Sequence, residues 1–176
     1  GSGLSTCGPT LARSADMTNR ESLSRLFEDV VLAYGGMDTL IITGGVFFPP
    51  DATGCISDSQ WRQTYEVNVI GPAMVAEEAY TVWLRQEMAV NLILTSSVNP
   101  TVSKVGSLAY DSSKAALNHL VRELAIQMAP LVRVNALAPA TVVEGSSMFP
   151  RERVISSLSK YQLTFNEHED TESLRR

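Results

Sequence analysis

Residues 91–97 read Asn-Leu-Ile-Leu-Thr-Ser-Ser, a short and nearly continuous apolar run that ends in two hydroxyl side chains. A run of this length and character is typical of a strand buried on both faces of a parallel sheet. Residues 39–43 (Thr-Leu-Ile-Ile-Thr) and 132–138 (Val-Arg-Val-Asn-Ala-Leu-Ala) are two further runs of this kind, and the last one stops at Pro139. We therefore expect three strands of one sheet.

Helical patterns separate these strands. Apolar residues recur every three or four positions from about residue 19 to 34, from 58 to 88 and from 107 to 128. Pro72 lies inside the second pattern and should kink that helix, because proline lacks a backbone N–H and clashes with the preceding turn. A further helix is expected at 151–158. This alternation predicts an α/β fold with a parallel sheet and right-handed crossovers.

Composition narrows the class of protein. The chain has 176 residues, of which 44% are hydrophobic, so one domain with a real core is expected. A net charge of −5 without a basic block disfavours a nucleic acid or an anionic membrane as partner. Apolar runs fall far short of the roughly 20 residues that span a bilayer, and a cytoplasmic location is the prediction. Cys7 and Cys55 form neither a metal cluster nor a disulfide framework.

The residues that follow the predicted strands form the candidate site, since open α/β sheets bind ligands outside the carboxyl ends of their strands. Ser97 follows the second strand, and residues 43–45 and 139–141 follow the other two. The next helix carries Tyr110 and Lys114, four residues apart and therefore on one face. A nearby cation lowers the pKa of a tyrosine phenol from about 10, which gives Tyr110 a route to general acid–base catalysis.

Each of these features also has a purely structural interpretation. Composition alone gives roughly one chance in twelve that some Tyr stands four residues before a Lys. Ser97 is equally a turn or helix-cap residue, and Gly44-Gly45 is equally a tight turn. Asn68, inside the second helical pattern, is equally a solvated surface residue. The order of the whole set along the chain is what favours a functional site.

In that order, the set resembles the short-chain dehydrogenase/reductase family. The resemblance covers residues 16 to about 148 of a single domain predicted over 1–176, and it implies a Rossmann-like, doubly wound parallel sheet. The matching segments are Asp16-Met17-Thr18, residues 39–45, Asn68-Val69-Ile70-Gly71, Ser97 placed 13 residues before Tyr110, Tyr110-Asp111-Ser112-Ser113-Lys114, and Arg133-Val134-Asn135 followed by Pro139-Ala140.

The resemblance implies an NAD- or NADP-dependent oxidoreductase that interconverts a small alcohol and a carbonyl by hydride transfer. Tyr110 would be the general acid/base, and Lys114 would lower the phenol's pKa and hold the nicotinamide ribose. Ser97 would orient the carbonyl, and Asn68 would anchor a water of the proton relay through a helix distortion. The implied cofactor contacts are Asp16 at the adenine, Gly44 and Gly45 at the adenosine ribose, Tyr110 and Lys114, and Pro139, Ala140 and Val142 along the nicotinamide.

The chain departs from the family pattern at several points. Ile42-Thr43-Gly44-Gly45 stands where Asn-Asn-Ala-Gly is usual, and Pro139-Ala140 stands where Pro-Gly is usual. The opening βαβαβ portion with its glycine-rich pyrophosphate turn is missing before Asp16, and so is the C-terminal strand. We therefore expect an incomplete domain, with an unpaired edge at the strand 39–43 and impaired cofactor binding. Residues 149–176 are the expected substrate lid.

Two further expectations concern the wider protein. The stretch 42–50, Ile-Thr-Gly-Gly-Val-Phe-Phe-Pro-Pro, is similar to the dehydrogenase half of bifunctional rhamnulose-phosphate aldolase/alcohol dehydrogenases. The alternative function is a non-catalytic binding or oligomerisation module of the same fold, favoured by the missing glycine turn. In that case helices 58–88 and 107–128 would pair across a homo-oligomer interface, or they would only cover the sheet. The candidate interface residues are Tyr80, Trp83, Leu117 and Val121.

Overall fold

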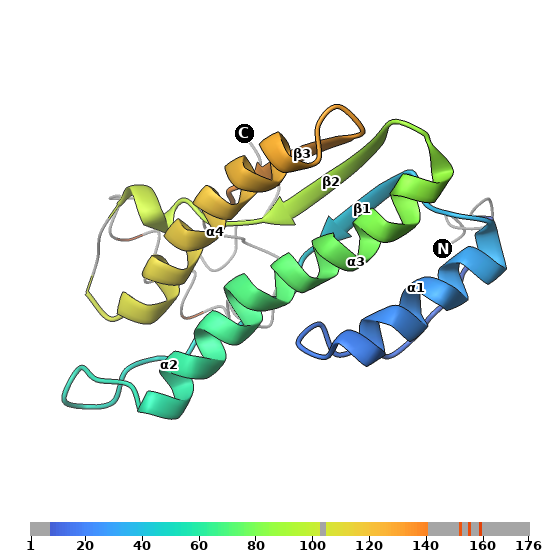
Figure 1. Cartoon of the computed structure of the whole chain (residues 1–176). Helices are drawn as coiled ribbons and strands as arrows, with labels where there is room; N and C mark the ends of the chain where they lie inside the picture. The colour runs from blue at the N-terminus through green and yellow to red at the C-terminus, as the bar shows by residue number, and fades with distance from the viewer. Residues whose placement is uncertain (1–7, 103–104, 141–151, 153–154, 156–158, 160–176) are drawn as a thin grey trace, which may run out of the picture.

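The structure is a computed structural model that describes residues 8–102, 105–140, 152, 155 and 159. Within these residues, helices and strands alternate in the order that the hydrophobic pattern predicts (Figure 1). The elements are α1 (Arg20–Tyr34), β1 (Thr39–Ile42), α2 (Asp58–Tyr65), a π-helical turn η1 (Glu66–Ile70), α3 (Gly71–Gln86), β2 (Val90–Thr95), a 3-10 turn η2 (Asn99–Thr101), α4 (Leu108–Gln127) and β3 (Val132–Leu137).

Local sequence explains where α1 and α2 begin and end. The Asn19 side chain accepts the Ser22 N–H at 3.0 Å and so caps the start of α1. Gly35 ends that helix with a φ of 80°, a left-handed conformation that glycine adopts without strain. Ser57 and Gln60 form a capping box at the start of α2.

The three strands form one parallel sheet in the order β1-β2-β3. Ile42 pairs with Leu94, and Leu92 pairs with Val134. Among the described residues, β1 pairs with β2 alone, which agrees with the predicted unpaired edge. Because parallel strands end at the same side of a sheet, the segments after all three strands meet at one rim.

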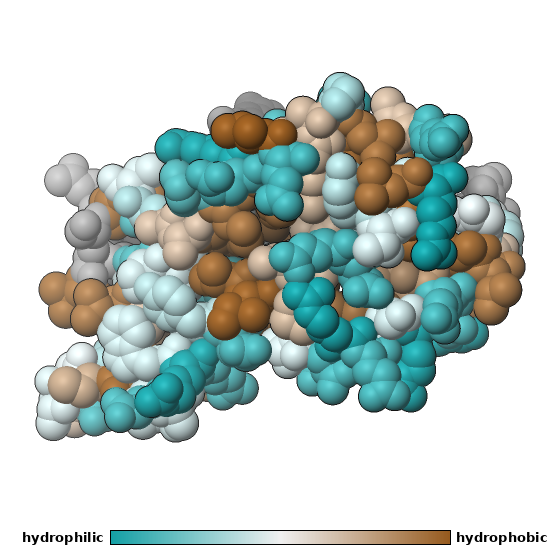
Figure 2. Space-filling model, in the orientation of Figure 1, coloured by the Kyte–Doolittle hydropathy of each residue, from teal (hydrophilic) through white to brown (hydrophobic). Residues whose placement is uncertain are grey.

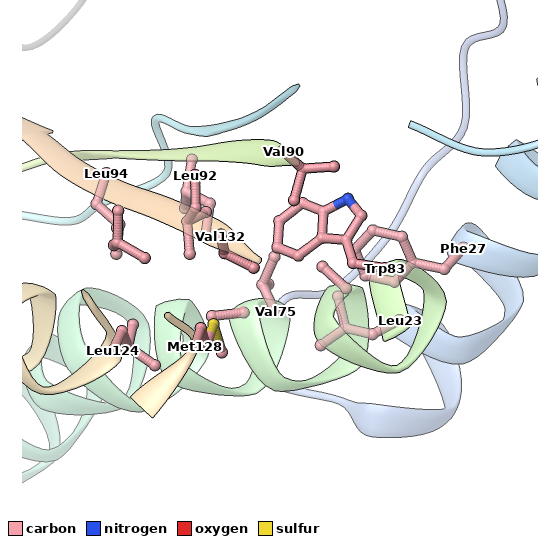
Figure 3. Packing of buried hydrophobic residues seen from close by; sticks show 14 of the residues in the cluster. Leu23, Phe27, Val75, Trp83, Val90, Leu92, Leu94, Leu124, Met128 and Val132 are labelled. Atoms are coloured by element: carbon pink, nitrogen blue, oxygen red, sulfur yellow. The ribbon is translucent and has the colours of Figure 1, made fainter. Parts of the chain in front are cut away.

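The two faces of the sheet differ. Because neighbouring strands follow one another in the chain, both crossovers cover the same face, and Figure 3 shows strand side chains packed against those of the helices. On the opposite face, Ile41 is 56% exposed and Leu137 is 58% exposed. The prediction of strands buried on both faces is therefore wrong for the described part of the chain. The buried strand residues are Ile42, Val90, Leu92, Leu94, Val132 and Val134.

The core holds two residues that were candidate interface residues. Trp83 is completely buried, and its indole N–H donates to the Met37 carbonyl oxygen at 3.0 Å. Leu117 is also buried, whereas Tyr80 and Val121 are partly buried against the same core. The prediction of Trp83 and Leu117 as partner contacts is therefore wrong, because the helices turn these side chains toward the sheet. On the face seen in Figure 2, apolar patches lie among hydrophilic side chains.

The predicted helix 58–88 is continuous but changes its geometry at its centre. The N–H of Gly71 bonds to the carbonyl of Glu66, five residues earlier, which makes η1 a π-helical turn between α2 and α3. Pro72 follows directly and has no N–H to offer the carbonyls of Val67 and Asn68. The proline is thus accommodated by a widened turn, and the distortion falls on Asn68 as predicted.

Two expectations fall largely outside the described residues. Of the predicted helix 151–158, only Glu152 and Ile155 are described, and both are helical. Most of the predicted lid 149–176, and Val142 before it, lie outside the description. In the described part of the chain, no helix has the length and apolar character needed to cross a membrane.

Candidate active site at the carboxyl edge of the sheet

Lys114 lies at the centre of the candidate site. Its side chain is only 3% exposed, and its Nζ donates to the carbonyl oxygen of Thr95, the last residue of β2, at 2.8 Å. The same nitrogen lies 5.7 Å from the centre of the Tyr110 ring, one helical turn earlier on α4. Burial lowers the pKa of Lys114 from 10.5 to about 8. The predicted tyrosine–lysine pair is thus formed at the end of β2.

Asn68 ties the rim together through its buried side chain. Its Oδ1 accepts the N–H of Val46 at 2.8 Å, and its Nδ2 donates to the carbonyl oxygen of Val46 at 3.0 Å. The same Nδ2 donates to the Ser113 hydroxyl at 3.0 Å, and that hydroxyl donates to the Tyr110 carbonyl oxygen at 2.7 Å. One amide therefore connects the segment after β1 with the turn of α4 that carries Tyr110. The surface interpretation of Asn68 is wrong.

Ser97 is buried two residues beyond β2, where the rim segments meet. Its hydroxyl oxygen accepts the backbone N–H of Asn99 at 3.1 Å, a local turn contact. The N–H groups of Ser96 and Val98 donate to the carbonyls of Leu137 and Pro139 at 2.7 and 3.1 Å. The Ser97 segment is therefore held directly beside the segment that follows β3.

The glycine pair after β1 lies between the two groups of predicted site residues. A Cβ on Gly44 would come within 2.8 Å of the Met17 sulfur, whereas one on Gly45 would lie 3.4 Å from the Asn68 Oδ1 and 3.6 Å from the Lys114 Nζ. Gly44 therefore contacts the segment of Asp16, and Gly45 lies beside Asn68 and Lys114. Glycine at both positions keeps this end of β1 free of side chains.

Asp16 directly precedes Met17, whose side chain lies against Gly44. Its exposed carboxylate accepts the N–H and hydroxyl of Thr18 at 2.8 and 2.7 Å, and these hydrogen bonds lower its pKa. It lines an open groove of about 740 Å³ together with Arg62 and Glu66. Neither Tyr110 nor Lys114 lines this groove.

Phe47 and a small pocket complete the surroundings of Tyr110. The Phe47 ring meets the Tyr110 ring edge to face, with 5.6 Å between their centres and an interplanar angle of 86°. Tyr110 also lines a pocket of about 170 Å³ between α2, the start of α4 and the loop after β1. Trp61 and Cys55 belong to its other walls.

The structure thus brings most of the predicted site residues to one rim. Five of them converge there: Asn68, Ser97, Tyr110, Lys114 and Gly45. Asp16 is connected to the rim through its neighbour Met17, which contacts Gly44. Pro139 lies beside the Ser97 segment and Ala140 follows it. No cluster of potential metal ligands occurs among the residues that the structure describes. The sequence did not predict that Phe47 contacts Tyr110, that Ser113 contacts Asn68, or that Asn99 contacts Ser97. These residues stand within two positions of predicted site residues, and that proximity could have marked them as candidates.

A parallel sheet with helical crossovers and a tyrosine–lysine pair at its carboxyl edge defines a part of a Rossmann-like α/β domain. A family model described as short chain dehydrogenase matches residues 5–153. The chain therefore belongs to the short-chain dehydrogenase/reductase family, whose dehydrogenases use NAD or NADP.

Curated relatives agree with this family. The chain is 30% identical over 136 residues to a glucose 1-dehydrogenase of Gluconobacter oxydans, covering 77% of this chain and 51% of that protein. It is 31% identical over 129 residues to a (-)-trans-carveol dehydrogenase of Rhodococcus erythropolis, covering 73% and 47%. It is also 30% identical over 145 residues to an uncharacterized oxidoreductase of Bacillus subtilis, covering 81% and 21%. The chain spans about half the length, or less, of these relatives.

Solved structures share the fold. The chain superposes on sorbitol-6-phosphate 2-dehydrogenase of Erwinia amylovora with a TM-score of 0.73 at 21% identity, covering 85% of this chain and 58% of that one. The ligand-free aldohexose dehydrogenase of Thermoplasma acidophilum gives a TM-score of 0.69 at 24% identity, covering 83% and 60%. An NADPH-dependent 3-quinuclidinone reductase of Rhodotorula rubra gives 0.64 at 27% identity, covering 71% and 47%.

Proposed function

We propose that this chain carries the catalytic centre of an NAD- or NADP-dependent oxidoreductase that interconverts an alcohol and a carbonyl. The observation that carries the proposal is the buried Lys114 ammonium, held on the Thr95 carbonyl at 2.8 Å and 5.7 Å from the centre of the Tyr110 ring. A buried cation beside a phenol favours the phenolate, so Tyr110 has the means to exchange a proton with a substrate oxygen near neutral pH.

The proposed roles follow from the geometry of the rim. The Ser97 hydroxyl accepts one hydrogen bond from Asn99 and retains its own hydrogen for a substrate oxygen, where it stabilises developing charge. Asn68 anchors a water of the proton relay. The widened turn at η1 and the missing N–H of Pro72 leave backbone carbonyl groups of this turn able to accept a hydrogen bond from that water. Tyr110 exchanges the proton with the substrate oxygen, and the Lys114 ammonium stabilises the phenolate form of Tyr110.

The described residues fit a dinucleotide along one path. Gly44 and Gly45 leave the end of β1 open to close approach, between Asp16 on the adenine side and Lys114 on the ribose side. Pro139 and Ala140 follow β3 and would lie along the nicotinamide, where Pro139 is hydrogen-bonded to the Ser97 segment; the proposed contact of Val142 falls outside the described residues. When bound, NAD or NADP supplies the hydride acceptor or donor. The chain's own part is positioning, proton transfer and electrostatics.

The alternative, a non-catalytic binding or oligomerisation module, rests on a different observation. Ile41 and Leu137 expose apolar surface on the sheet face that the described helices leave uncovered, and β1 is an edge strand in the described part. Such surfaces favour association with further protein. A monodisperse monomer in analytical ultracentrifugation would contradict the oligomerisation module and the proposed homo-oligomer.

The bifunctional assignment and the cytoplasmic location also stay proposals. The stretch 42–50 supports the first, together with the Bacillus subtilis relative, in which the matching segment makes up only 21% of the protein. Intact-mass analysis of the protein isolated from its own cells tests whether these residues belong to a much longer polypeptide, and fractionation tests its compartment.

The catalytic proposal is tested by following reduced nicotinamide at 340 nm with NADH or NADPH and a panel of small aldehydes and ketones. In the full-length protein that contains these residues, the expected result is turnover that disappears in Tyr110→Phe. A second titration follows nicotinamide fluorescence on binding, with Lys114→Met expected to weaken it and exposed Arg122→Met as the matched charge-removal control. Turnover retained by Tyr110→Phe would reject the assignment.

A further inference from the structure

Asp111, the neighbour of Tyr110 in the chain, makes two short contacts with its carboxylate. Its Oδ1 accepts the side-chain N–H of Asn99 at 2.7 Å, and its Oδ2 accepts the hydroxyl of Ser107 at 2.6 Å. Both oxygens are thus engaged by neutral donors, and hydrogen bonds to a charged acceptor are stronger than neutral ones. The carboxylate therefore ties the 3-10 turn after β2 to the first turn of α4.

The contact with Asn99 leads directly to the predicted catalytic serine. Asn99 uses its side chain on Asp111 and its backbone N–H on the Ser97 hydroxyl oxygen, at 3.1 Å. A hydroxyl oxygen that accepts a fixed hydrogen bond has a defined orientation, and its own hydrogen remains available for donation. The orientation of Ser97 therefore depends on where the side chain of Asn99 is held.

We propose that Asp111 is a positioning residue for Ser97: it anchors the Asn99 side chain, and the Asn99 backbone N–H in turn aims the Ser97 hydroxyl at the substrate oxygen. This inference rests on the proposed oxidoreductase function, and it adds a residue that touches neither substrate nor cofactor. The same carboxylate is attached to α4 beside Tyr110, so one group sets the spacing between the hydroxyl and the phenol.

A simpler role for Asp111 predicts different behaviour. A carboxylate in the first turn of α4 stabilises the helix through the helix dipole and through Ser107, the residue before the helix. If that were its whole contribution, removing it would lower stability and leave the chemical step unchanged. The experiment must therefore separate the effect of the hydrogen bond to Asn99 from the effect of the hydrogen bond to Ser107.

The decisive variants break the contact between Asp111 and Asn99, either alone in Asn99→Ala or together with the Ser107 contact in Asp111→Ala. We expect Asp111→Ala and Asn99→Ala each to lower kcat by about 10-fold to 100-fold with little change in KM for the cofactor, because a misplaced donor acts on the transition state. The double variant should be no worse than either single one, since both break the same link. Asp111→Asn, which keeps an acceptor for Asn99, should recover most of the loss.

Two further variants serve as controls. Ser107→Ala removes only the hydrogen bond between Ser107 and Asp111. It should lower the melting temperature while changing kcat by less than about threefold. Glu123→Ala removes an exposed carboxylate from the same helix and should change neither quantity. Unchanged kcat in Asp111→Ala, or additive losses in the double variant, would overturn the proposal.

A measurement without turnover keeps the inference separate from the proposed function. In ¹⁵N-labelled protein, the side-chain amide hydrogens of Asn99 should exchange slowly in the wild type and in Asp111→Asn, and rapidly in Asp111→Ala. Rapid exchange in the wild type would overturn the Asp111 proposal even if the enzyme is active. An inactive full-length wild type with slow Asn99 exchange would reject the oxidoreductase function and keep the anchoring of Asn99.

Discussion

Asn68 holds Val46 at both of its backbone polar groups, accepting its N–H at 2.8 Å and donating to its carbonyl at 3.0 Å. The amide is completely buried, and its donor group is shared with Ser113. This double contact replaces the strand pairing that Val46 lacks beyond the end of β1. It holds the loop after β1 in place, and the next residue of that loop, Phe47, packs against Tyr110.

Replacing Asn68 by Ala should therefore strongly destabilise the protein. Both polar groups of Val46 and the Ser113 hydroxyl would lose a buried partner, and we expect a loss of about 2–4 kcal/mol in the free energy of unfolding. Urea denaturation measures it. Asn91→Ala is the matched control, because Asn91 makes one long side-chain hydrogen bond of 3.3 Å, and it should cost less than about 0.5 kcal/mol.

Burial of Lys114 predicts a pH dependence of stability. Its pKa is lowered to about 8 in the folded protein against 10.5 in the unfolded chain, so between these values the unfolded chain binds more protons. Stability should therefore rise as the pH increases from about 8 to 10.5. Lys114→Met should abolish this rise in denaturation curves measured across that range, whereas exposed Arg122→Met should retain it. An equal rise in Lys114→Met would contradict the assignment.

Removal of the phenolic hydroxyl tests the role of Tyr110 alone. Tyr110→Phe keeps the ring that meets Phe47 edge to face, so the fold and nicotinamide binding should be retained. We expect turnover to fall by at least about 100-fold, the usual contribution of a general acid–base group. Tyr80→Phe, on α3 against the core, is the control and should keep full turnover.

Gly45 offers a test of the cofactor path. A Cβ there would meet only ordinary van der Waals distances of 3.4 and 3.6 Å, so Gly45→Ala should fold normally. The added methyl group would occupy space beside Lys114 that the cofactor path requires, and we expect nicotinamide affinity to fall by roughly 10-fold. Gly8→Ala, with nothing within 4 Å, is the control for fluorescence titration. Equal affinity in both variants would place the cofactor elsewhere.

Much of the fold followed from local patterns. The three apolar runs became β1, β2 and β3, and the start of α1 at Arg20 agrees with the helical pattern predicted from about residue 19. The continuous runs did not reveal that the face of Ile41 would be left exposed by the residues that the structure describes. That outcome depends on the order of neighbouring strands, which places both crossovers on one side.

Some features of the candidate site could likewise be predicted from the sequence, and others could not. The spacing of Tyr110 and Lys114 was visible because one helical turn sets it, and residues 43–45, 97 and 139–140 were identified as a rim because parallel strands end together. The contacts of Asn68 with Val46 and Ser113 were not visible. They join three segments that no local periodicity relates.

The sequence by itself determined which segments become helices and strands, where they end, and which residues follow each strand, because these depend on local hydrogen bonding and on the period of apolar side chains. Only the tertiary structure decided that Trp83 and Leu117 face the core, that Asn68 hydrogen-bonds Val46 and Ser113, and that Lys114 is buried against Thr95. Those outcomes depend on packing between segments distant in the chain, where burial sets which polar groups must find partners.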